Sequence, residues 1–191
     1  MFGLSVALTT PFSQTGAIDD HLMVAHSKWV LQNGANSITL FGTTGEGTSI
    51  SQVEKLKTLQ TLIKEDILPS KINATVITSS LQNAILQCVE YHSLGVKRIL
   101  IAPPFFFKDI SFEGLLSWYS AVFTALRSLK IQFILYNIPQ LTMVAIKPEL
   151  ISALQSEFGS ETIFEVKDST GNLEGTLEFL KNKDLMVAVG D

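Results

Sequence analysis

The feature that most limits the possible folds of this chain is an unbroken alternation of short apolar segments with longer amphipathic ones. The apolar segments are rich in β-branched residues and are each bounded by turn-forming residues, as strands are. The amphipathic segments between them have the spacing of surface helices. This alternation predicts an α/β protein with a parallel sheet. The predicted strands cover residues 4–9, 37–41, 73–78, 98–102, 132–136, 162–167 and 185–189.

Local signals mark the ends of the intervening helices. Gly34 is placed to end the first helix as a C′ glycine. Ser51 and Glu54 form the pattern of a capping box, and Pro148 suits a first helical position. The predicted helices cover about residues 20–33, 51 onward, 80–95, 112–129, 148 onward and 172 onward. No linker or low-complexity stretch interrupts the series, so we expect one domain over residues 1–191.

Two architectures fit this order of elements, a doubly wound open sheet and a (β/α)8 TIM barrel. Both place functional residues at the C-terminal ends of the strands. A complete barrel needs at least about 200 residues, whereas this chain has 191 and ends after a seventh predicted strand. We therefore expect a barrel truncated after the seventh strand. The chain would be a fragment of a larger enzyme, a truncated gene product, or one whose remainder is unrecorded.

The composition disfavours several classes of function. The net charge of −4 and the scattered basic residues give no basis for binding nucleic acid or an anionic membrane. The longest apolar run, residues 99–107, contains two prolines and is shorter than the roughly 20 residues of a membrane helix. Cys88 is the single cysteine, which excludes an intrachain disulfide and a thiolate metal cluster. We expect a cytoplasmic globular protein without a metal site.

Lys167 is the first candidate for chemistry. It ends the predicted strand at residues 162–167 and precedes a turn, which is where α/β enzymes place functional side chains. A lysine there can attack a carbonyl group and form a Schiff base if its surroundings keep the amine neutral. The alternative is a solvated surface lysine paired with Asp168.

Two further strand ends carry residues that complement such an amine. The loop Gly42–Glu46 offers turn glycines, backbone N–H groups and the hydroxyls of Thr43 and Thr44, which together suit a carboxylate. Phosphate is a competing ligand, but the phosphate-binding glycine motifs are absent. Tyr136 could move a proton between substrate atoms. The alternatives are an ordinary glycine-rich turn and a packed tyrosine. In combination, the three features are the parts needed for class I aldol chemistry on a 2-oxo acid.

Four motifs, in this order and spacing, resemble those of the dihydrodipicolinate synthase / N-acetylneuraminate lyase family. They are Thr10–Phe12, Gly42–Glu46, Tyr136–Pro139 and Val166–Asn172. The resemblance covers the whole chain. It implies a homotetrameric (β/α)8 barrel that holds pyruvate as a Schiff base, with no metal or organic cofactor. By the same resemblance Lys167 is the Schiff-base lysine, Tyr136 is the proton shuttle and Thr43 stands in the proton relay. Thr44, Gly45, Leu141 and Gly190 would line the substrate site.

Three departures from the family pattern bear on the substrate. Leu141 stands where the synthases usually have an arginine for the carboxylate of the aldehyde substrate. Phe105 and Phe106 replace a tyrosine pair, one of which carries a proton in a neighbouring subunit's site. Glu165 takes the place of a small residue and, by strand alternation, shares a face with Lys167. A carboxylate facing the amine would stabilise its protonated form and slow attack, unless local twist displaces both residues.

These observations predict a pyruvate-dependent aldolase or lyase, similar to N-acetylneuraminate lyase or to keto-deoxy sugar acid aldolases. The first alternative is 4-hydroxy-tetrahydrodipicolinate synthase of lysine biosynthesis, which Leu141 and Phe106 disfavour. The second is a non-catalytic member of the family that binds 2-oxo acids without turnover.

Overall fold

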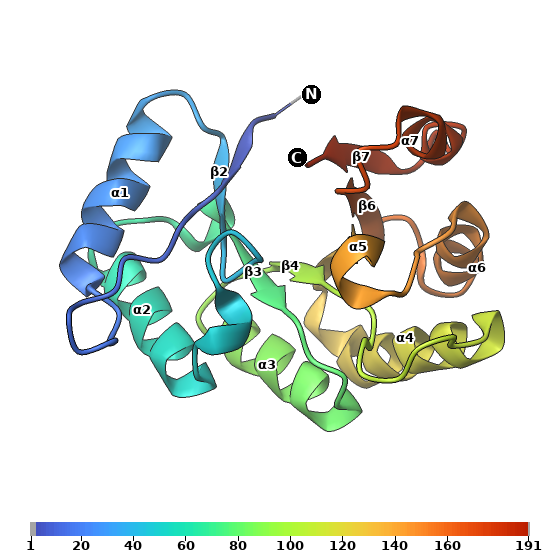
Figure 1. Cartoon of the computed structure of the whole chain (residues 1–191), viewed down its shortest axis with the longest axis horizontal. Helices are drawn as coiled ribbons and strands as arrows, with labels where there is room; N and C mark the ends of the chain where they lie inside the picture. The colour runs from blue at the N-terminus through green and yellow to red at the C-terminus, as the bar shows by residue number, and fades with distance from the viewer. Residues whose placement is uncertain (1–2, 191) are drawn as a thin grey trace. The chain divides into compact units, whose positions relative to one another are not determined.

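The computed structural model describes residues 3–190 of the chain. These residues form two compact units. Of the described residues, the N-terminal unit contains 3–75 with Glu90–Arg98, and the C-terminal unit contains Val76–Val89 with 99–190. The strands β1 to β7 are ordered in the sheet as they are in the chain, and each of the first six is followed by a helix before the next strand begins (Figure 1). All seven predicted strands are confirmed.

The N-terminal unit contains three parallel strands and the helices that follow them. Its elements are β1 (Ser5–Ala7), α1 (Asp20–Gln32), β2 (Ser37–Leu40), the 3-10 turn η1 (Gly47–Ser49), α2 (Gln52–Lys64), the 3-10 turn η2 (Pro69–Lys71) and most of β3 (Ile72–Val76). β1 pairs with β2 and β2 with β3, both in parallel. The capping box of Ser51 and Glu54 at the start of α2 is confirmed. So is the glycine end of α1, since Gly34 follows the cap residue Asn33 with φ of 105°.

Polar side chains join the strands of this unit, a feature that the apolar strand pattern does not predict. The Ser5 hydroxyl lies 3.0 Å from that of Thr39, and Asn73 Nδ2 donates to both, at 3.0 and 3.2 Å. Asn73 and Thr39 are buried. Because buried polar groups are costly unless they are hydrogen-bonded, each of the three hydroxyl and amide groups depends on the others.

The C-terminal unit contains the remaining strands. Its elements are part of α3 (Leu81–Ser93), β4 (Arg98–Ile101), α4 (Phe112–Leu126), the 3-10 turn η3 (Arg127–Leu129), β5 (Gln132–Asn137), α5 (Pro139–Thr142), α6 (Pro148–Phe158), β6 (Ile163–Asp168), α7 (Leu173–Phe179) and β7 (Met186–Val189). β5 pairs with β6 and β6 with β7, again in parallel. The short helix α5 was not predicted, because four residues are too few to show helical periodicity.

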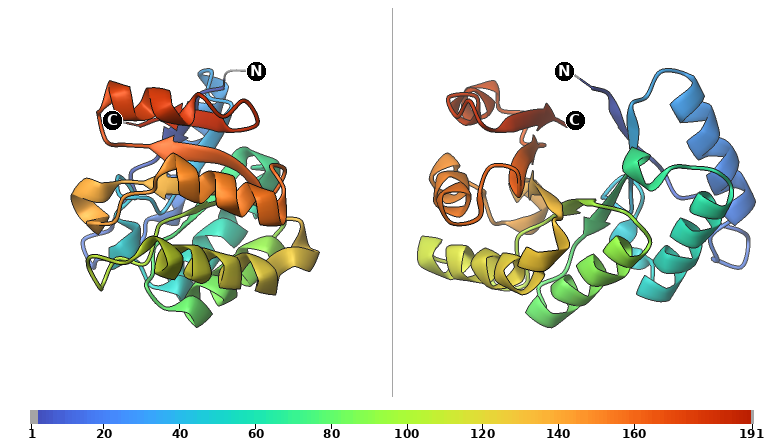
Figure 2. Two further views of the ribbon diagram at one scale, coloured as in Figure 1. Left: turned by 90° about the vertical axis from the view of Figure 1, so that its right-hand side faces the viewer. Right: turned by 180° about the vertical axis from the view of Figure 1, so that it is seen from behind.

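An aromatic cluster forms the core between the helices and β5. Phe123 of α4 packs on Phe133 of β5 and on Phe158 of α6, with ring centroids 4.4 and 5.6 Å apart. The two helices lie side by side (Figure 2). Within α4, the Tyr119 ring stacks on that of Phe123. Pro148 begins α6 and Asn172 caps α7, as predicted. Within residues 3–190, no helix is long and apolar enough to cross a bilayer.

Candidate active site

Lys167 and Tyr136 come together at the ends of two adjacent strands of the C-terminal unit. They are register partners in the parallel pairing of β5 with β6, so their side chains emerge on the same face. The Nζ atom of Lys167 lies over the Tyr136 ring, 4.7 Å from its centroid. A cation at this distance is attracted by the electrons of the ring. The sequence placed these two residues at separate strand ends, and the register makes them neighbours.

The surroundings of Lys167 differ in two respects from a fully apolar pocket. The residue is partly exposed rather than buried. Val166, the residue before Lys167, pairs with Leu135 and lies on the opposite face of the strand, since successive side chains alternate. The apolar residues on the face of Tyr136 are instead Leu100, Ala102, Ile134 and Ile138, with Phe164 packed against them.

A β-bulge in β6 explains how both Phe164 and Glu165 face this cluster. Phe133 pairs with Ile163, but the next residue of β5, Ile134, pairs with Glu165, so Phe164 is an extra residue. Beyond the bulge, Glu165 and Lys167 pair with Ile134 and Tyr136, which belong to one cluster. Glu165 therefore shares the face of Lys167, as strand alternation predicted.

Gly190 leaves the space that the lysine side chain uses. A Cβ atom at Gly190 would lie 2.8 Å from Lys167 Cε and 2.5 Å from the hydroxyl oxygen of Ser169. The Gly190 N–H donates to the carbonyl of Asp168 at 2.8 Å, which fixes this approach. A glycine at this position is thus required for the lysine conformation observed.

Ser169 lies near Lys167, beside Gly190, and the sequence analysis did not single it out. Its hydroxyl is buried and has no hydrogen-bond partner within the part of the chain that the structure describes. Its backbone is held at both ends: the N–H donates to Asn137 O at 2.9 Å, and the carbonyl accepts from Gln140 Nε2. The available signal was its spacing of two residues from Lys167, which puts both side chains on one face.

Asp168 has a structural environment rather than a catalytic one. Its buried carboxylate accepts hydrogen bonds from Asn137 Nδ2 at 2.9 Å and from the Thr176 hydroxyl at 2.5 Å. It also accepts from the Thr170 N–H at 3.3 Å. The alternative in which Asp168 pairs with Lys167 on the surface is therefore wrong, because Asp168 points away from the lysine face and is 1% exposed.

The loop Gly42–Gly47 belongs to the N-terminal unit and is braced from several sides. Gly45 O accepts from the Thr10 hydroxyl at 2.7 Å, and Gly47 N–H donates to Gly42 O at 3.0 Å. A Cβ atom at either Gly45 or Gly47 would collide with the backbone. At Gly45 it would lie 2.7 Å from Leu8 O, and at Gly47 it would lie 1.7 Å from Phe41 O. The glycines of this loop are thus required by close backbone approach.

The loop retains donors for an anion. Within residues 3–190, the N–H groups of Thr44 and Gly45 make no internal hydrogen bond, and the side chains of Thr43 and Thr44 are exposed. Such a set of backbone donors and hydroxyls suits a carboxylate. Among the same residues, no group of three or more histidine, cysteine, aspartate or glutamate side chains is arranged to hold a metal ion.

Leu141 and Phe106 lie on the surface of the C-terminal unit. Leu141, in α5, is 58% exposed, and Phe106, in the loop after β4, is 72% exposed. The loop of Phe106 is anchored by the Ser79 hydroxyl, which accepts from the N–H groups of Phe105 and Phe106 at 3.0 and 2.9 Å. Neither Leu141 nor Phe106 contributes a charge or a hydroxyl to this surface.

Comparisons with known proteins show which family the chain resembles. A model of the dihydrodipicolinate synthetase family matches residues 1–191. The 4-hydroxy-tetrahydrodipicolinate synthase of Agrobacterium fabrum (strain C58 / ATCC 33970) is 30% identical over 172 residues, which are 90% of this chain and 56% of that protein. The crystal structure of dihydrodipicolinate synthase from Agrobacterium tumefaciens str. C58 matches with a TM-score of 0.96 and 42% identity, covering 100% of this chain and 67% of that one.

A 2-keto-3-deoxygluconate aldolase from Picrophilus torridus matches with a TM-score of 0.89 and 25% identity, over 100% of this chain and 68% of its own. The structural matches confirm the predicted fold, seven strands of a (β/α)8 barrel. The chain spans little more than half the length of the curated relative, 56%.

Proposed function

The chain belongs to the dihydrodipicolinate synthetase family, and we propose that it carries the imine-forming residues of a pyruvate-dependent class I aldolase or lyase. The observation that carries this proposal is the juxtaposition of Lys167, Tyr136 and Gly190. An amine, a phenol and a position without a side chain meet on one face of adjacent strands. A relative named as a lyase and a solved structure named as an aldolase support the same reaction class.

The proposed chemistry begins with attack of the neutral Lys167 amine on the ketone carbon of a 2-oxo acid. A carbon–nitrogen bond forms, and the ketone oxygen leaves as water after taking up two protons. The resulting iminium withdraws electrons, which makes the adjacent methyl group acidic or, in cleavage, accepts the electrons of the breaking carbon–carbon bond. Tyr136 is placed to move protons in these steps because it lies beside the amine and is 2% exposed. No metal or organic cofactor is needed.

In this proposal the loop Gly42–Gly47 binds the carboxylate of the substrate. Thr44 and Gly45 supply N–H donors, and Thr43 takes part in the proton relay. The donors are fixed before the substrate arrives, because the loop is held by the Thr10 and Gly42 hydrogen bonds. Preorganised donors lower the cost of orienting the substrate for reaction.

For the second substrate we favour a neutral hydroxylated aldehyde, as in the lyase and keto-deoxy sugar acid aldolase branches. Leu141 supports this choice because an apolar, uncharged side chain provides no partner for the carboxylate of aspartate semialdehyde. The synthase of lysine biosynthesis remains the second candidate, since relatives named 4-hydroxy-tetrahydrodipicolinate synthase share the family.

Borohydride reduction in the presence of pyruvate tests the reaction class. We expect a stable mass increase on the peptide that contains Lys167, loss of that increase in Lys167→Ala, and normal labelling in Lys183→Ala, a control at an exposed lysine. Measurable pyruvate binding without trapping would instead identify a non-catalytic binding protein. Turnover with sialic acid, 2-keto-3-deoxy sugar acids and aspartate semialdehyde then assigns the second substrate.

We also propose that the protein assembles with further copies of itself, as a tetramer. An exposed apolar surface on the C-terminal unit supports this. The side chains of Phe106 and Phe107 are 72% and 74% exposed. The Lys108 amine donates hydrogen bonds to Phe105 O and to Thr142 O, which links this loop to the end of α5. Met143, the residue after Thr142, is 65% exposed. Clustered exposed aromatic residues are typical of protein interfaces.

A further inference from the structure

Lys55 is buried in the N-terminal unit although it lies on a surface helix. It sits in the second turn of α2 and is 6% exposed, whereas Lys57, two residues later, has a side chain that is 70% exposed. A buried lysine normally has an acidic partner. Within residues 3–190, Lys55 makes no ion pair and no hydrogen bond through its amine. Its contact is with an aromatic ring: the amine nitrogen lies 5.9 Å from the centroid of Phe41.

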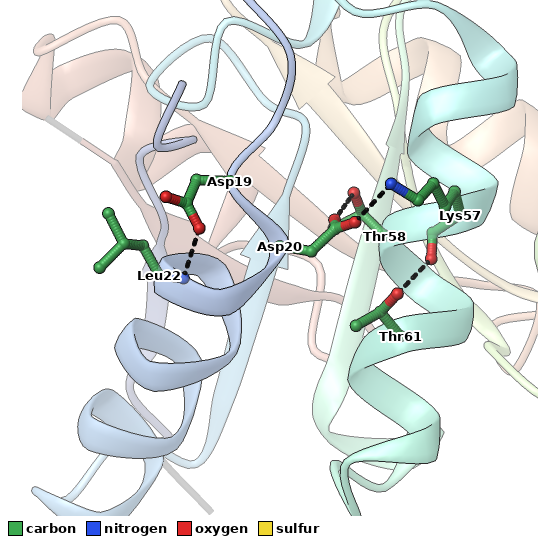
Figure 3. Close-up of polar contacts among 6 residues, drawn as sticks. All are labelled: Asp19, Asp20, Leu22, Lys57, Thr58 and Thr61. Carbon is green, nitrogen blue, oxygen red and sulfur yellow. Dashed lines mark hydrogen bonds and ion pairs between the residues drawn. The ribbon is translucent and has the colours of Figure 1, made fainter. Parts of the chain in front are cut away.

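The neighbouring charged and titratable groups are already engaged or face solvent. Asp20 of α1 contacts Lys57 Nζ at 2.9 Å and accepts from the Thr58 hydroxyl at 2.9 Å (Figure 3). Glu54 closes the capping box with Ser51. The Glu90 carboxylate accepts a hydrogen bond from Gln52 Nε2, and the Tyr91 hydroxyl donates one to Gln52 Oε1. Glu46 of the loop is exposed. The charge of Lys55 is thus uncompensated by any of these groups.

Phe41 connects Lys55 to the loop that binds the carboxylate in the proposed function. It is the residue between β2 and Gly42, and its φ of 61° lies in the left-handed region that residues with side chains seldom adopt. Its carbonyl oxygen occupies the space where a Cβ of Gly47 would be, 1.7 Å away. The strained turn at Phe41 therefore sets the path of the loop at both of its ends, and such strain concentrates at functional sites.

We propose that Lys55 is a positioning residue for this loop: its cation, packed on the Phe41 ring, holds the left-handed turn and adds positive charge near the carboxylate donors. The inference rests on the proposed function, because it assumes that the loop binds the substrate carboxylate. A purely structural role explains the burial less well, since an unpaired buried cation opposes folding.

The charge of Lys55 depends on pH within an accessible range. Burial lowers the pKa of Lys55 from 10.5 to about 8. At pH 7 the side chain is therefore mostly protonated, and it loses its charge as the pH rises through about 8. Substrate binding through this cation should then weaken over the same interval, while a pyruvate carboxylate stays ionised throughout.

The test compares Lys55→Met, Lys55→Arg and the control Lys57→Met. For Lys55→Met at pH 7 we expect the KM for pyruvate to rise about fivefold with kcat changed less than about twofold. Lys55→Arg should restore most of the affinity because it keeps the charge, and Lys57→Met should match the wild type. Between pH 7 and 9.5 the KM of the wild type should rise towards that of Lys55→Met.

An unchanged KM and pH profile in Lys55→Met would overturn the inference. An equal defect in Lys55→Arg and Lys55→Met would also overturn it, because the charge would then be irrelevant. Failure of the proposed function is separate: wild-type protein that gives no adduct with pyruvate and borohydride at any pH would remove the premise without involving Lys55.

Discussion

At the scale of single residues, the site depends on which face of a strand each side chain occupies. One face of β6 carries Glu165 and Lys167, and Ser169 continues this face just after the strand. The other face carries Val166 and Asp168. Lys167 and Ser169 both border Gly190, whereas Val166 and Asp168 are buried. A shift of the register by one residue would exchange the two groups, so the proposed chemistry depends on the register of β6.

Glu165 is the residue on this face most open to a direct test. Its carboxylate lies two residues from Lys167 on the same face of β6. We expect Glu165→Gln to raise the rate of imine formation with pyruvate at pH 7 about threefold, because the variant removes a negative charge from the face of the amine. The measurement is the initial rate of borohydride trapping with pyruvate between pH 6 and 9. Glu174→Gln, at an exposed position on α7, serves as the control, and coincident profiles for Glu165→Gln and wild type would dismiss the effect.

A second prediction concerns the effect of Lys55 on the free energy of unfolding. Its pKa is about 8 in the folded protein and 10.5 when exposed, so the unfolded chain holds more protons between these values. The folded protein therefore pays a penalty below pH 8 that is relieved as the pH rises towards 10.5. The shift corresponds to at most about 3 kcal/mol.

We accordingly expect Lys55→Met to raise the free energy of unfolding at pH 7, by up to about 3 kcal/mol, and by less at pH 9.5. Urea denaturation at the two pH values measures the difference, with Lys57→Met as the matched variant. A loss of stability in Lys55→Met at pH 7 would contradict this prediction, because the contact with Phe41 would then outweigh the cost of burying the charge.

At the scale of elements, the C-terminal ends of β5, β6 and β7 are joined by a chain of hydrogen bonds. Ser169 N–H bonds to Asn137 O, and Gly190 N–H bonds to Asp168 O. The Asp168 carboxylate links the same strand ends to α7 through Thr176. These bonds hold the strand ends at fixed spacing, so a site built on them is more rigid than one built on free loops.

Gly190→Ala tests how closely β7 must approach Lys167. The added methyl group would lie 2.8 Å from Lys167 Cε, and the flexible lysine would move rather than the backbone. We expect the rate of imine trapping to fall about tenfold because the amine is displaced, with a melting temperature close to that of the wild type. Gly175→Ala is the control, since its Cβ would meet only ordinary contacts at 3.6 Å or more. Equal trapping rates in the two variants would contradict the proposed role of Gly190.

At the scale of the whole molecule, the exposed aromatic surface around Phe106 supports assembly with further copies. Two adjacent charges there would prevent burial of this surface. We expect the double variant Phe106→Asp, Phe107→Asp to sediment as a smaller species than the wild type at the same concentration. Val53→Asp, at a 77% exposed apolar position on α2, should not change the sedimentation. Identical sedimentation of the double variant and the wild type would locate the interface elsewhere.

Local patterns in the sequence were enough to predict the order of the elements and to locate the functional residue types at the strand ends. Apolar β-branched segments, the Ser51 capping box, Gly34 and Pro148 act through local chemistry, so the strands and most helix ends were predicted correctly. The sequence also predicted that Lys167 and Glu165 share a face, because strand alternation is local. Only the tertiary structure decided that Tyr136 is the partner of Lys167, that Asp168 is a buried anchor, and that Ser169 and Lys55 are enclosed. These facts depend on strand register, on a bulge and on packing between elements, which bring together residues distant in the chain.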